Sequence, residues 1–429
     1  MEDDARANSR GLSSRSLIAA CTVGNALEFY DLLIFSFFAP TIGKLFFPSG
    51  DANAQLLFAF ATYGVGFFLR PLGGLLLGAY ADRHGRRKAT ILTLMLMALG
   101  TLAIGLAPTY AQAGALGPAI VILGRLAQGF SAGGEVGAST TLLTESAPAL
   151  RRGFFGSWQL ASQGLGIVAA SAAAAVVFGR LEPGEVEAWG WRIPFLLGVL
   201  IVPVGLWLRS AIGETHANIA HTDTRELSAA ASIVSDHWRT LLSGVIMVIG
   251  GAAANTVVVL YMSNYAIKYL GMAPKTALLA GLVAGVVTLL VAPVAGAVSD
   301  RIGRKALPSG AYVALAVMIY PAFLALNAVP TLTMLLVVVG LMSAINAAGA
   351  APALVLLTEI FPARVRATGM SLVYALGVTV FGGFGQFIVT WLIQRTDSPV
   401  APAFYVIVCV LVAFLALRGA PETARARLA

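Results

Sequence analysis

The sequence predicts an all-α membrane protein in which twelve transmembrane helices form two bundles of six. Three observations carry this prediction: the composition, a series of long apolar segments, and motifs that occur twice. Of the 429 residues, 58% are hydrophobic and only 11% are charged, whereas soluble domains carry about 25% charged residues. A water-facing fold could not bury so many apolar side chains. The composition therefore excludes an ordinary soluble protein.

Twelve segments are long and apolar enough to cross a bilayer, which takes roughly 20 residues of helix. We expect helices at 17–45, 54–81, 89–107, 117–145, 153–179, 192–212, 239–270, 275–299, 305–326, 331–359, 365–394 and 400–418. The first segment follows an acidic start and is too long for a cleaved signal peptide. We therefore expect it to be retained as a membrane span.

Basic residues lie mostly on one side of these predicted helices. The N-terminus, the even-numbered loops and the C-terminus hold 20 of the 28 lysines and arginines, while the odd-numbered loops hold six. By the positive-inside rule, both termini are cytoplasmic. The longest polar loop divides the chain into an N-terminal bundle (1–212), a cytoplasmic linker (213–238) and a C-terminal bundle (239–429). The net charge of +8 belongs to the membrane surface, so we expect no nucleic-acid partner.

Two motifs occur once in each half at nearly the same offset. The pattern Gly-x-x-x-Asp-Arg-x-Gly-Arg begins at Gly78 and again at Gly296, an offset of 218 residues. The pattern Thr-Glu-x-x-Pro-x-x-x-Arg begins at Thr144 and again at Thr358, an offset of 214 residues. Two unrelated motifs at nearly one offset indicate that the halves are duplicates.

These repeated residues are predicted to form a cytoplasmic gate. Glycines permit tight turns, an acid at a helix end can pair with an arginine or a helix N-terminus, and basic residues hold the loops in the cytoplasm. The gate set is Gly78, Asp82, Arg83, Gly85, Arg86, Glu145, Arg152, Gly296, Asp300, Arg301, Gly303, Arg304, Glu359 and Arg366. The alternative is that such charges only set topology, which we favour for Arg86. For Asp82 and Asp300 we predict a salt-bridged latch.

Five charged residues fall deep inside the predicted helices: Glu28, Asp31, Arg70, Arg125 and Glu135. Each costs roughly 2.5–3.5 kcal/mol at a helix centre unless it faces protein or water, so together they indicate a polar interior. Static pairing of all five is one interpretation, and we predict a structural ion pair for Asp31 with Arg70. Three acids against two arginines leave one acid unpaired, and that acid would take up a proton. We predict that Glu28 or Glu135 carries a coupling proton.

Uncharged polar residues converge on the same depth. Together with one arginine they give the predicted substrate-binding set: Asn25, Arg125, Gln159, Gln163, Asn255, Asn346 and Gln386. Arg125, alone or together with Arg70, is predicted to hold a substrate carboxylate, because a guanidinium binds a carboxylate through two parallel hydrogen bonds. Each amide taken singly could instead bond neighbouring helices. Tyr374 is expected to pack.

The sequence contains no phosphate-binding loop, no metal-ligand spacing and no nucleophile motif. We therefore expect no enzyme activity, no metal and no cofactor, with protons as the coupling ion. Cys21 and Cys409 both lie in apolar segments and imply no disulfide.

The repeated Gly-x-x-x-Asp-Arg-x-Gly-Arg loops resemble the signature of the major facilitator superfamily. Further motifs are similar to those of its metabolite:proton symporter family, which includes bacterial citrate–proton symporters: Gly24-Asn25-x-x-Glu28-x-x-Asp31, Phe68-x-Arg70-Pro71-x-Gly73 and Gly124-Arg125-x-x-Gln128-Gly129. The family also contains dicarboxylate, shikimate and osmolyte carriers. The seventh predicted helix departs from the citrate branch, because residues 250–256 lack that branch's run of threonines.

The resemblance implies a secondary transporter of the bacterial inner membrane. Its implied activity is proton-coupled uptake of a small carboxylate, such as citrate or another tri- or dicarboxylate. A proton-coupled betaine- or proline-type osmolyte carrier is the main alternative, and a non-transporting substrate sensor is another. The expected partners are a small anionic substrate, protons and the lipid bilayer, and the expected state is a monomer.

Overall fold

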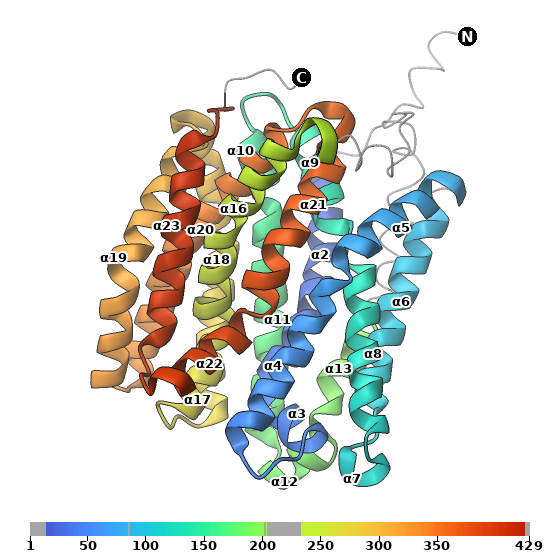
Figure 1. Cartoon of the computed structure of the whole chain (residues 1–429), viewed down its shortest axis with the longest axis vertical. Helices are drawn as coiled ribbons and strands as arrows, with labels where there is room; N and C mark the ends of the chain where they lie inside the picture. Colours follow the sequence, from blue (N-terminus) through green and yellow to red (C-terminus); the bar gives the residue numbers. More distant parts are fainter. Residues whose placement is uncertain (1–13, 85, 201–202, 204–232, 425–429) are drawn as a thin grey trace.

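The computed structural model describes residues 14–84, 86–200, 203 and 233–424. This part of the chain is helical and contains no strand, so the all-α prediction is confirmed. The helices run side by side between two ends of the molecule (Figure 1). We call the end that holds Glu145, Asp300 and Arg366 the motif end. The other end, which holds α3 (Ala39–Phe46) and α17 (Met262–Lys268), is called the opposite end.

The N-terminal half begins with α2 and ends, as far as it is described, in α13. Its elements are α2 (Ser14–Phe37), α3, α4 (Ala52–Phe68), α5 (Arg70–His84), α6 (Arg86–Leu106), α7 (Tyr110–Ala113), α8 (Leu116–Ser131), α9 (Glu135–Glu145), α10 (Arg152–Gly156), α11 (Trp158–Arg180), α12 (Pro183–Glu185), the π-helical turn η1 (Val186–Gly190) and α13 (Arg192–Gly198).

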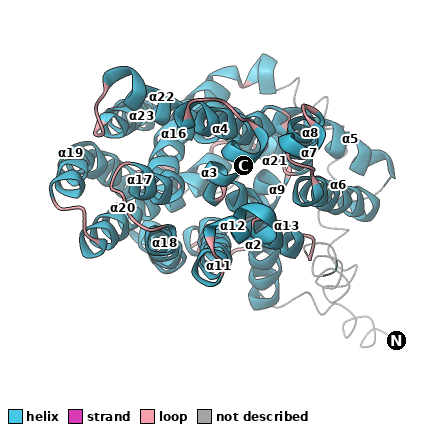
Figure 2. Ribbon diagram, turned by 90° about the horizontal axis from the view of Figure 1, so that it is seen from below, coloured by secondary structure: helices cyan, strands magenta, loops and turns pink. Residues whose placement is uncertain are grey.

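The C-terminal half begins with α16 and ends with α23. Its elements are α16 (Trp238–Asn255), the π-helical turn η3 (Thr256–Tyr261), α17, α18 (Pro274–Ile302), α19 (Ala306–Ala328), α20 (Leu332–Glu359), the 3-10 turn η4 (Ala363–Val365), α21 (Arg366–Val378), the π-helical turn η5 (Thr379–Gly383), α22 (Gly385–Thr396) and α23 (Ala401–Gly419). The helices of this half fill one side of the molecule when it is viewed along its length (Figure 2).

Each of the twelve predicted spans coincides with helical structure, although the sixth is described only through α13 and Pro203. In the described residues, eight segments are long and apolar enough to cross a membrane, and a bent pair, Cys21–Phe37 with Ala39–Phe46, makes a ninth. The pair bends by 60° just before Pro40, because proline favours the first turn of a new helix. The predicted linker 213–238 lies mostly outside the described residues, so the domain boundaries stay predictions.

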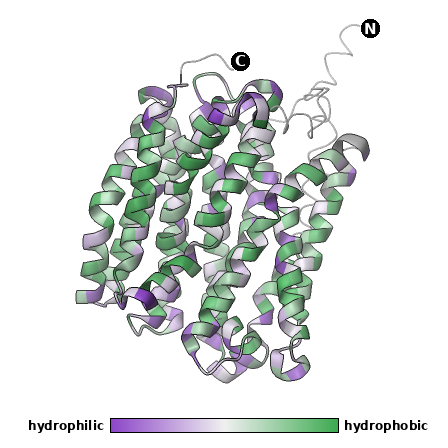
Figure 3. Ribbon diagram, viewed as in Figure 1, coloured by the Kyte–Doolittle hydropathy of each residue, from purple (hydrophilic) through white to green (hydrophobic). Residues whose placement is uncertain are grey.

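The outer surface of the bundle is apolar between its two ends (Figure 3). Leu123, Leu290, Val317 and Leu415 are each more than 60% exposed, and they come from four different helices. Water would make such a surface unfavourable, whereas lipid tails match it. The bundle is therefore built to lie in a bilayer.

The two halves make their closest contact where α11 packs along α18. A Cβ atom added to Gly164 would lie 2.7 Å from the carbonyl oxygen of Gly285, and one added to Gly285 would lie 2.8 Å from the carbonyl oxygen of Gly164. Only glycine permits backbones to approach this closely. These contacts set the two halves face to face around the site described next.

Candidate functional site

A cavity lies between the two halves near the middle of their helices. The empty space in and around it, including the part open to solvent, is about 890 Å³. Most of its lining is apolar. The polar and aromatic polar residues that line it are Tyr63, Arg70 and Gln163 from the N-terminal half and Asn255, Thr256, Tyr312, Asn346 and Tyr374 from the C-terminal half.

Arg70 is the charged residue of this cavity wall. It begins α5 after a break in the helix at Leu69, and Pro71, which follows it, explains why a new helix starts here. Its side chain is buried, and its guanidinium carbon lies 4.2 Å from the centre of the Phe67 ring. Its Nε atom has no hydrogen-bond partner among the described residues. A guanidinium in this position can bind a carboxylate inside the cavity.

Arg125 lies behind the cavity wall and is not among the residues that line it, and its substrate-binding role stays a prediction. Its Nη1 donates to Gln128 Oε1 at 2.8 Å, and its Nη2 donates to the carbonyl oxygen of Tyr63 at 3.3 Å. Its guanidinium also stacks 4.8 Å and 4.9 Å from the ring centres of Phe35 and Tyr63. The two terminal nitrogens of Arg125 are thus bonded within the protein, while its Nε atom, like that of Arg70, has no hydrogen-bond partner among the described residues.

The predicted ion pair between Asp31 and Arg70 is also absent from the described structure. Asp31 Oδ2 accepts hydrogen bonds from Thr101 Oγ1 at 2.7 Å and from Gln128 Nε2. Gln128 follows Arg125 by one helical turn, so its amide bridges that arginine to Asp31. The sequence predicted similar depths for Asp31 and Arg70 on adjacent helices, but in the structure Asp31 is bonded to Thr101 and Gln128.

Glu28 and Glu135 come together beside Arg70. Glu28 is 2% exposed, and neither of its carboxyl oxygens has a hydrogen-bond partner in the part of the chain that is described. The charged residues that act on it electrostatically include Glu135 and Arg70. Glu135 begins α9 after the break at Gly133 and Gly134, and its Oε1 lies 3.7 Å from where a Cβ on Gly24 would sit. Two carboxyl groups from different helices therefore lie close together, and the Arg70 guanidinium acts on that of Glu28.

The predicted amide residues divide into two groups. Gln163, Asn255 and Asn346 line the cavity, and Gln163 Nε2 donates across the halves to the Tyr374 hydroxyl at 3.5 Å. Tyr374 was expected only to pack, and no sequence signal distinguished it from the other tyrosines.

The other three amides bond helices instead of lining the cavity. Asn25 Nδ2 donates to the carbonyl oxygen of Gln159 at 3.2 Å, and Gln159 Nε2 donates back to Asn25 Oδ1 at 3.0 Å. Gln386 Oε1 accepts from Ser36 Oγ at 2.9 Å, which joins the two halves. Near the same place, Asn264 Nδ2 donates to the carbonyl oxygen of Ser36 at 2.9 Å. The alternative role considered for these amides, helix bonding, fits these three positions.

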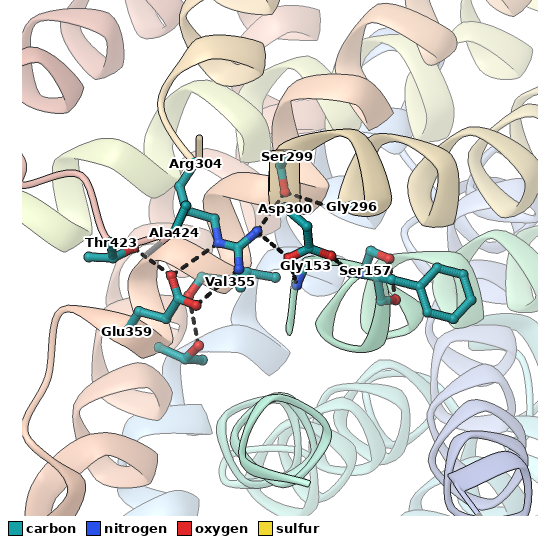
Figure 4. A network of polar contacts seen from close by, with 12 residues as sticks. Gly153, Ser157, Gly296, Ser299, Asp300, Arg304, Val355, Glu359, Thr423 and Ala424 are labelled. Atoms are coloured by element: carbon teal, nitrogen blue, oxygen red, sulfur yellow. Dashed lines mark hydrogen bonds and ion pairs between the residues drawn. The ribbon is translucent and has the colours of Figure 1, made fainter. Parts of the chain in front are cut away.

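At the motif end, Asp300 forms a latch between the halves (Figure 4). Its two carboxyl oxygens accept the backbone N–H groups of Gly153 at 2.7 Å and Phe154 at 3.0 Å, at the start of α10. Arg304 Nη1 lies 2.8 Å from Asp300 Oδ1, and Arg304 Nε lies 3.1 Å from Glu359 Oε2. Residues of both repeated motifs in the C-terminal half thus form one buried network, and through Asp300 this network contacts α10 of the N-terminal half.

A second ion pair joins the halves at this end. Arg366 Nη1 lies 2.6 Å from Glu145 Oε1, while Arg366 Nε donates to the carbonyl oxygen of Thr358 at 3.0 Å. Glu145 is 43% exposed in its side chain, so this pair is partly open to solvent. Contacts between the halves therefore exist both at the motif end and, through Ser36, toward the opposite end.

The remaining predicted gate residues are less informative. Gly296 packs directly on the carbonyl oxygen of Gly153, Arg152 is buried in α10, and Arg301 is exposed. Gly303 has a φ of +106°, which favours glycine. For the first copy of the motif, Gly78 lies in α5, whereas Gly85 and the side chains of Asp82, Arg83 and Arg86 lie outside what the structure describes.

The segment after α23 also belongs to this network, which the sequence did not indicate. Glu422 Oε1 accepts from the backbone N–H of Arg304 at 2.7 Å, and Thr423 Oγ1 donates to Glu359 Oε2. Burial opposes ionisation of Glu422, but the N–H groups of Arg304, Ala424, Lys305 and Thr423 outweigh it and lower the pKa of this carboxyl. A Glu-Thr pair after the last span was the only available signal.

The sequence matches the family model of the Major Facilitator Superfamily in two segments, residues 21–328 and 246–429. It is 38% identical over 388 residues to the citrate-proton symporter of Klebsiella pneumoniae, covering 90% of this chain and 87% of that protein. It is 34% identical to the alpha-ketoglutarate permease of Escherichia coli K12, with 93% and 91% covered, and 31% identical to the proline/betaine transporter of the same strain, with 96% and 84% covered.

The solved structures support the same fold. The partially occluded inward-open xylose transporter XylE from E. coli matches with a TM-score of 0.77 at 19% identity, covering 96% of this chain and 98% of that one. The twelve-span architecture read from the sequence is that of these proteins. The relatives described above are transporters and not enzymes. The chain therefore belongs to the major facilitator superfamily.

Proposed function

We propose that this chain is a proton-coupled symporter that takes up a small carboxylate across the bacterial inner membrane. The single observation that carries the proposal is the position of Arg70, which lines the cavity and acts electrostatically on Glu28, whose carboxyl group lies near that of Glu135. The citrate-proton symporter and the alpha-ketoglutarate permease among its relatives support the carboxylate. We place the motif end in the cytoplasm because basic residues gather there.

Arg70 links the substrate to the proton in this proposal. With the cavity empty, its charge is balanced by the neighbouring acids. When a substrate carboxylate takes over the guanidinium, Glu28 loses that balancing charge, and a buried unpaired carboxylate is unfavourable. Glu28 then takes up a proton, directly or through Glu135. Substrate and proton therefore enter the closed carrier together.

Release follows from rocking of the two halves about the cavity, as in carriers built from repeated bundles. Opening the motif end breaks the contacts of Asp300 with α10 and of Arg366 with Glu145. Opening the opposite end breaks the bonds of Ser36 with Gln386 and Asn264. Each set closes while the other is open, so the cavity meets one side at a time. We expect a monomer to suffice, since the cavity lies within one chain.

The test is uptake into proteoliposomes that contain the purified full chain. Radiolabelled citrate, 2-oxoglutarate and a set of simpler carboxylates are offered with and without an imposed proton gradient. We expect accumulation that collapses with an uncoupler, because an anion must bring protons to avoid working against an inward-negative potential. Accumulation that follows a sodium gradient after the proton gradient is removed would refute the coupling.

A proton-coupled osmolyte carrier is the second candidate. The proline/betaine transporter relative favours it, and a zwitterion also offers a carboxylate to Arg70. Adding betaine and a carboxylate anion at equal concentrations to the same vesicles separates the two candidates. Preferred accumulation of betaine would select the osmolyte carrier.

A further inference from the structure

The cavity offers one positive charge to a ligand. Among the described residues that line it, Arg70 is the only charged one. Arg125 is held by Gln128 and the Tyr63 carbonyl behind the wall. Lys268 stands at the end of α17, 5.4 Å from the Tyr269 ring, and it does not line the cavity. A ligand with several carboxylates would find a cation for only one of them.

The wall next to Arg70 is aromatic. The Phe67 ring lies 4.2 Å from the guanidinium, and the Tyr63 and Phe67 ring centres are 5.4 Å apart. Both rings line the cavity, so an apolar surface continues directly from the anion-binding group. A ligand that binds Arg70 through a carboxylate places its neighbouring atoms against these rings.

The rest of the lining is largely aliphatic. Leu33, Ile167, Met247, Leu260, Leu354 and Leu357 are among the residues that surround the space. The polar groups that remain are the uncharged amides of Gln163, Asn255 and Asn346 and the hydroxyls of Tyr63, Thr256, Tyr312 and Tyr374. They can bond a hydroxyl or a carbonyl, but they cannot balance a second or third carboxylate in a poorly hydrated cavity.

From this lining we infer that the site selects a carboxylate with one negative charge and an apolar body, in preference to a polyanion such as citrate. The inference rests on the proposed carboxylate symport and narrows its substrate class. One carboxylate binds Arg70, and the hydrocarbon part of the ligand fills the space between Phe67 and the aliphatic side chains. Citrate would leave two carboxylates in that apolar space.

The experiment is equilibrium binding to the purified full chain at neutral pH. The probes are acetate, propanoate, butanoate and pentanoate, with benzoate, succinate and citrate, and benzamide as the uncharged match of benzoate. We expect affinity to rise along the straight-chain series by about fourfold per buried methylene. We also expect benzoate to bind at least tenfold more tightly than citrate, succinate or benzamide.

The outcomes separate the inference from the proposed function. Citrate binding that equals or exceeds benzoate binding, with a flat straight-chain series, overturns the inference and leaves carboxylate symport standing. Benzamide binding that equals benzoate binding, with none of the carboxylates preferred, overturns both the inference and the proposed carboxylate symport, because Arg70 would then not distinguish a negatively charged ligand from an uncharged one. The expected pattern supports both.

A variant tests the charge argument from the opposite direction. Asn346→Arg adds a second cation to the cavity wall from α20. We expect the affinity ratio of succinate to butanoate to rise at least tenfold relative to the wild type. Gly310→Arg is the matched control, because nothing lies within 4 Å of the Cβ position there, and it should leave the ratio unchanged. An unchanged ratio in a folded Asn346→Arg protein counts against the inference, and the wild-type series decides if that variant fails to fold.

Discussion

The two halves of this transporter repeat the same motifs but bring different chemistry to the cavity. Around it the N-terminal half holds five charged residues, Glu28, Asp31, Arg70, Arg125 and Glu135, whereas the C-terminal half lines it with neutral groups such as Asn255, Asn346 and Tyr374. The described contact across the cavity is accordingly neutral, from Gln163 to Tyr374. At the motif end the order is reversed, because the buried charges Asp300, Arg304 and Glu359 belong to the C-terminal half.

This difference teaches how one duplicated unit can divide two tasks. In the proposed mechanism the charges that exchange a proton and an anion must stay close together, and the described residues given these roles all belong to the N-terminal half. The facing half can then move away from the cavity without separating an ion pair in a poorly hydrated space. The charged contacts between the halves lie instead at the motif end, where water can reach them once the halves part.

The largest expected effect separates the two arginines of the N-terminal half. Arg70→Lys keeps the charge but removes the two-pronged geometry, so we expect carboxylate affinity to fall roughly 10- to 150-fold, the cost of one hydrogen bond to a charged group. Arg125→Lys disturbs the network with Gln128 and Asp31. Compared with Arg70→Lys, it should lower the melting temperature more and the carboxylate affinity less. Equilibrium binding and thermal unfolding measure both. A larger loss of affinity in Arg125→Lys would restore Arg125 as the substrate residue.

The next effect concerns the acids. Glu28→Gln should abolish uphill uptake while leaving exchange of labelled for unlabelled substrate, because exchange needs no net proton movement. Asp31→Asn is the matched control, since Asp31 Oδ2 accepts hydrogen bonds from Thr101 and Gln128, whereas neither carboxyl oxygen of Glu28 has a partner among the described residues. Its accumulation ratio should stay close to that of the wild type once stability is matched. Normal accumulation in both Glu28→Gln and Glu135→Gln would show that neither acid carries the proton.

The sequence allowed the helices to be predicted, because apolar length is a local pattern. The repeated motifs singled out Asp300, Arg304, Glu359 and Arg366, which the structure places in contacts at the motif end, and their gating role stays a prediction. The surroundings of Arg70 and Arg125 could not be predicted, because depth along a helix can be counted from the sequence, but rotation about its axis cannot. Arg70 begins a new helix after the break at Leu69.

The contacts of Glu422 could not be predicted for another reason. They join the segment after α23 to the loop after α18, more than 100 residues earlier, and most of the atoms bonded to Glu422 are backbone N–H groups. Every residue except proline has a backbone N–H group, so the residue types do not indicate which N–H groups a carboxylate binds. The same holds for Asp300, whose predicted helix N-terminus proved to be that of α10 in the other half.

A smaller effect tests the charged contacts at the motif end. Asp300→Asn should weaken the bonds to Gly153 and Phe154 and to Arg304 by about 1.5–3 kcal/mol in the closed state. The protein would then open more often at this end. With Cys21 and Cys409 replaced, a cysteine at buried Ser157 should react faster with a maleimide in Asp300→Asn than in the parent. Asp397→Asn, at an exposed acid of the opposite end, is the control, and equal labelling rates in all three proteins would argue against the latch.

The smallest expected effect concerns Glu422, whose carboxylate binds the N–H groups of Arg304 and Lys305. These bonds lower the pKa of Glu422 below its ordinary value of 4.5, against the effect of burial. A lowered pKa in the folded state means that the stabilisation is complete above about pH 4.5 and is lost as the pH falls through the folded-state pKa. Glu422→Gln should therefore lower the melting temperature at pH 7 by about 1–2 °C, since the residue is largely exposed. Thermal unfolding from pH 7 to well below pH 4.5 should show this difference shrinking, because the wild-type carboxylate takes up a proton as the pH falls through its lowered folded-state pKa, while the variant has no charge to lose. A difference that stayed constant across that range would mean that the side chain stabilises the motif end through shape and not through its charge.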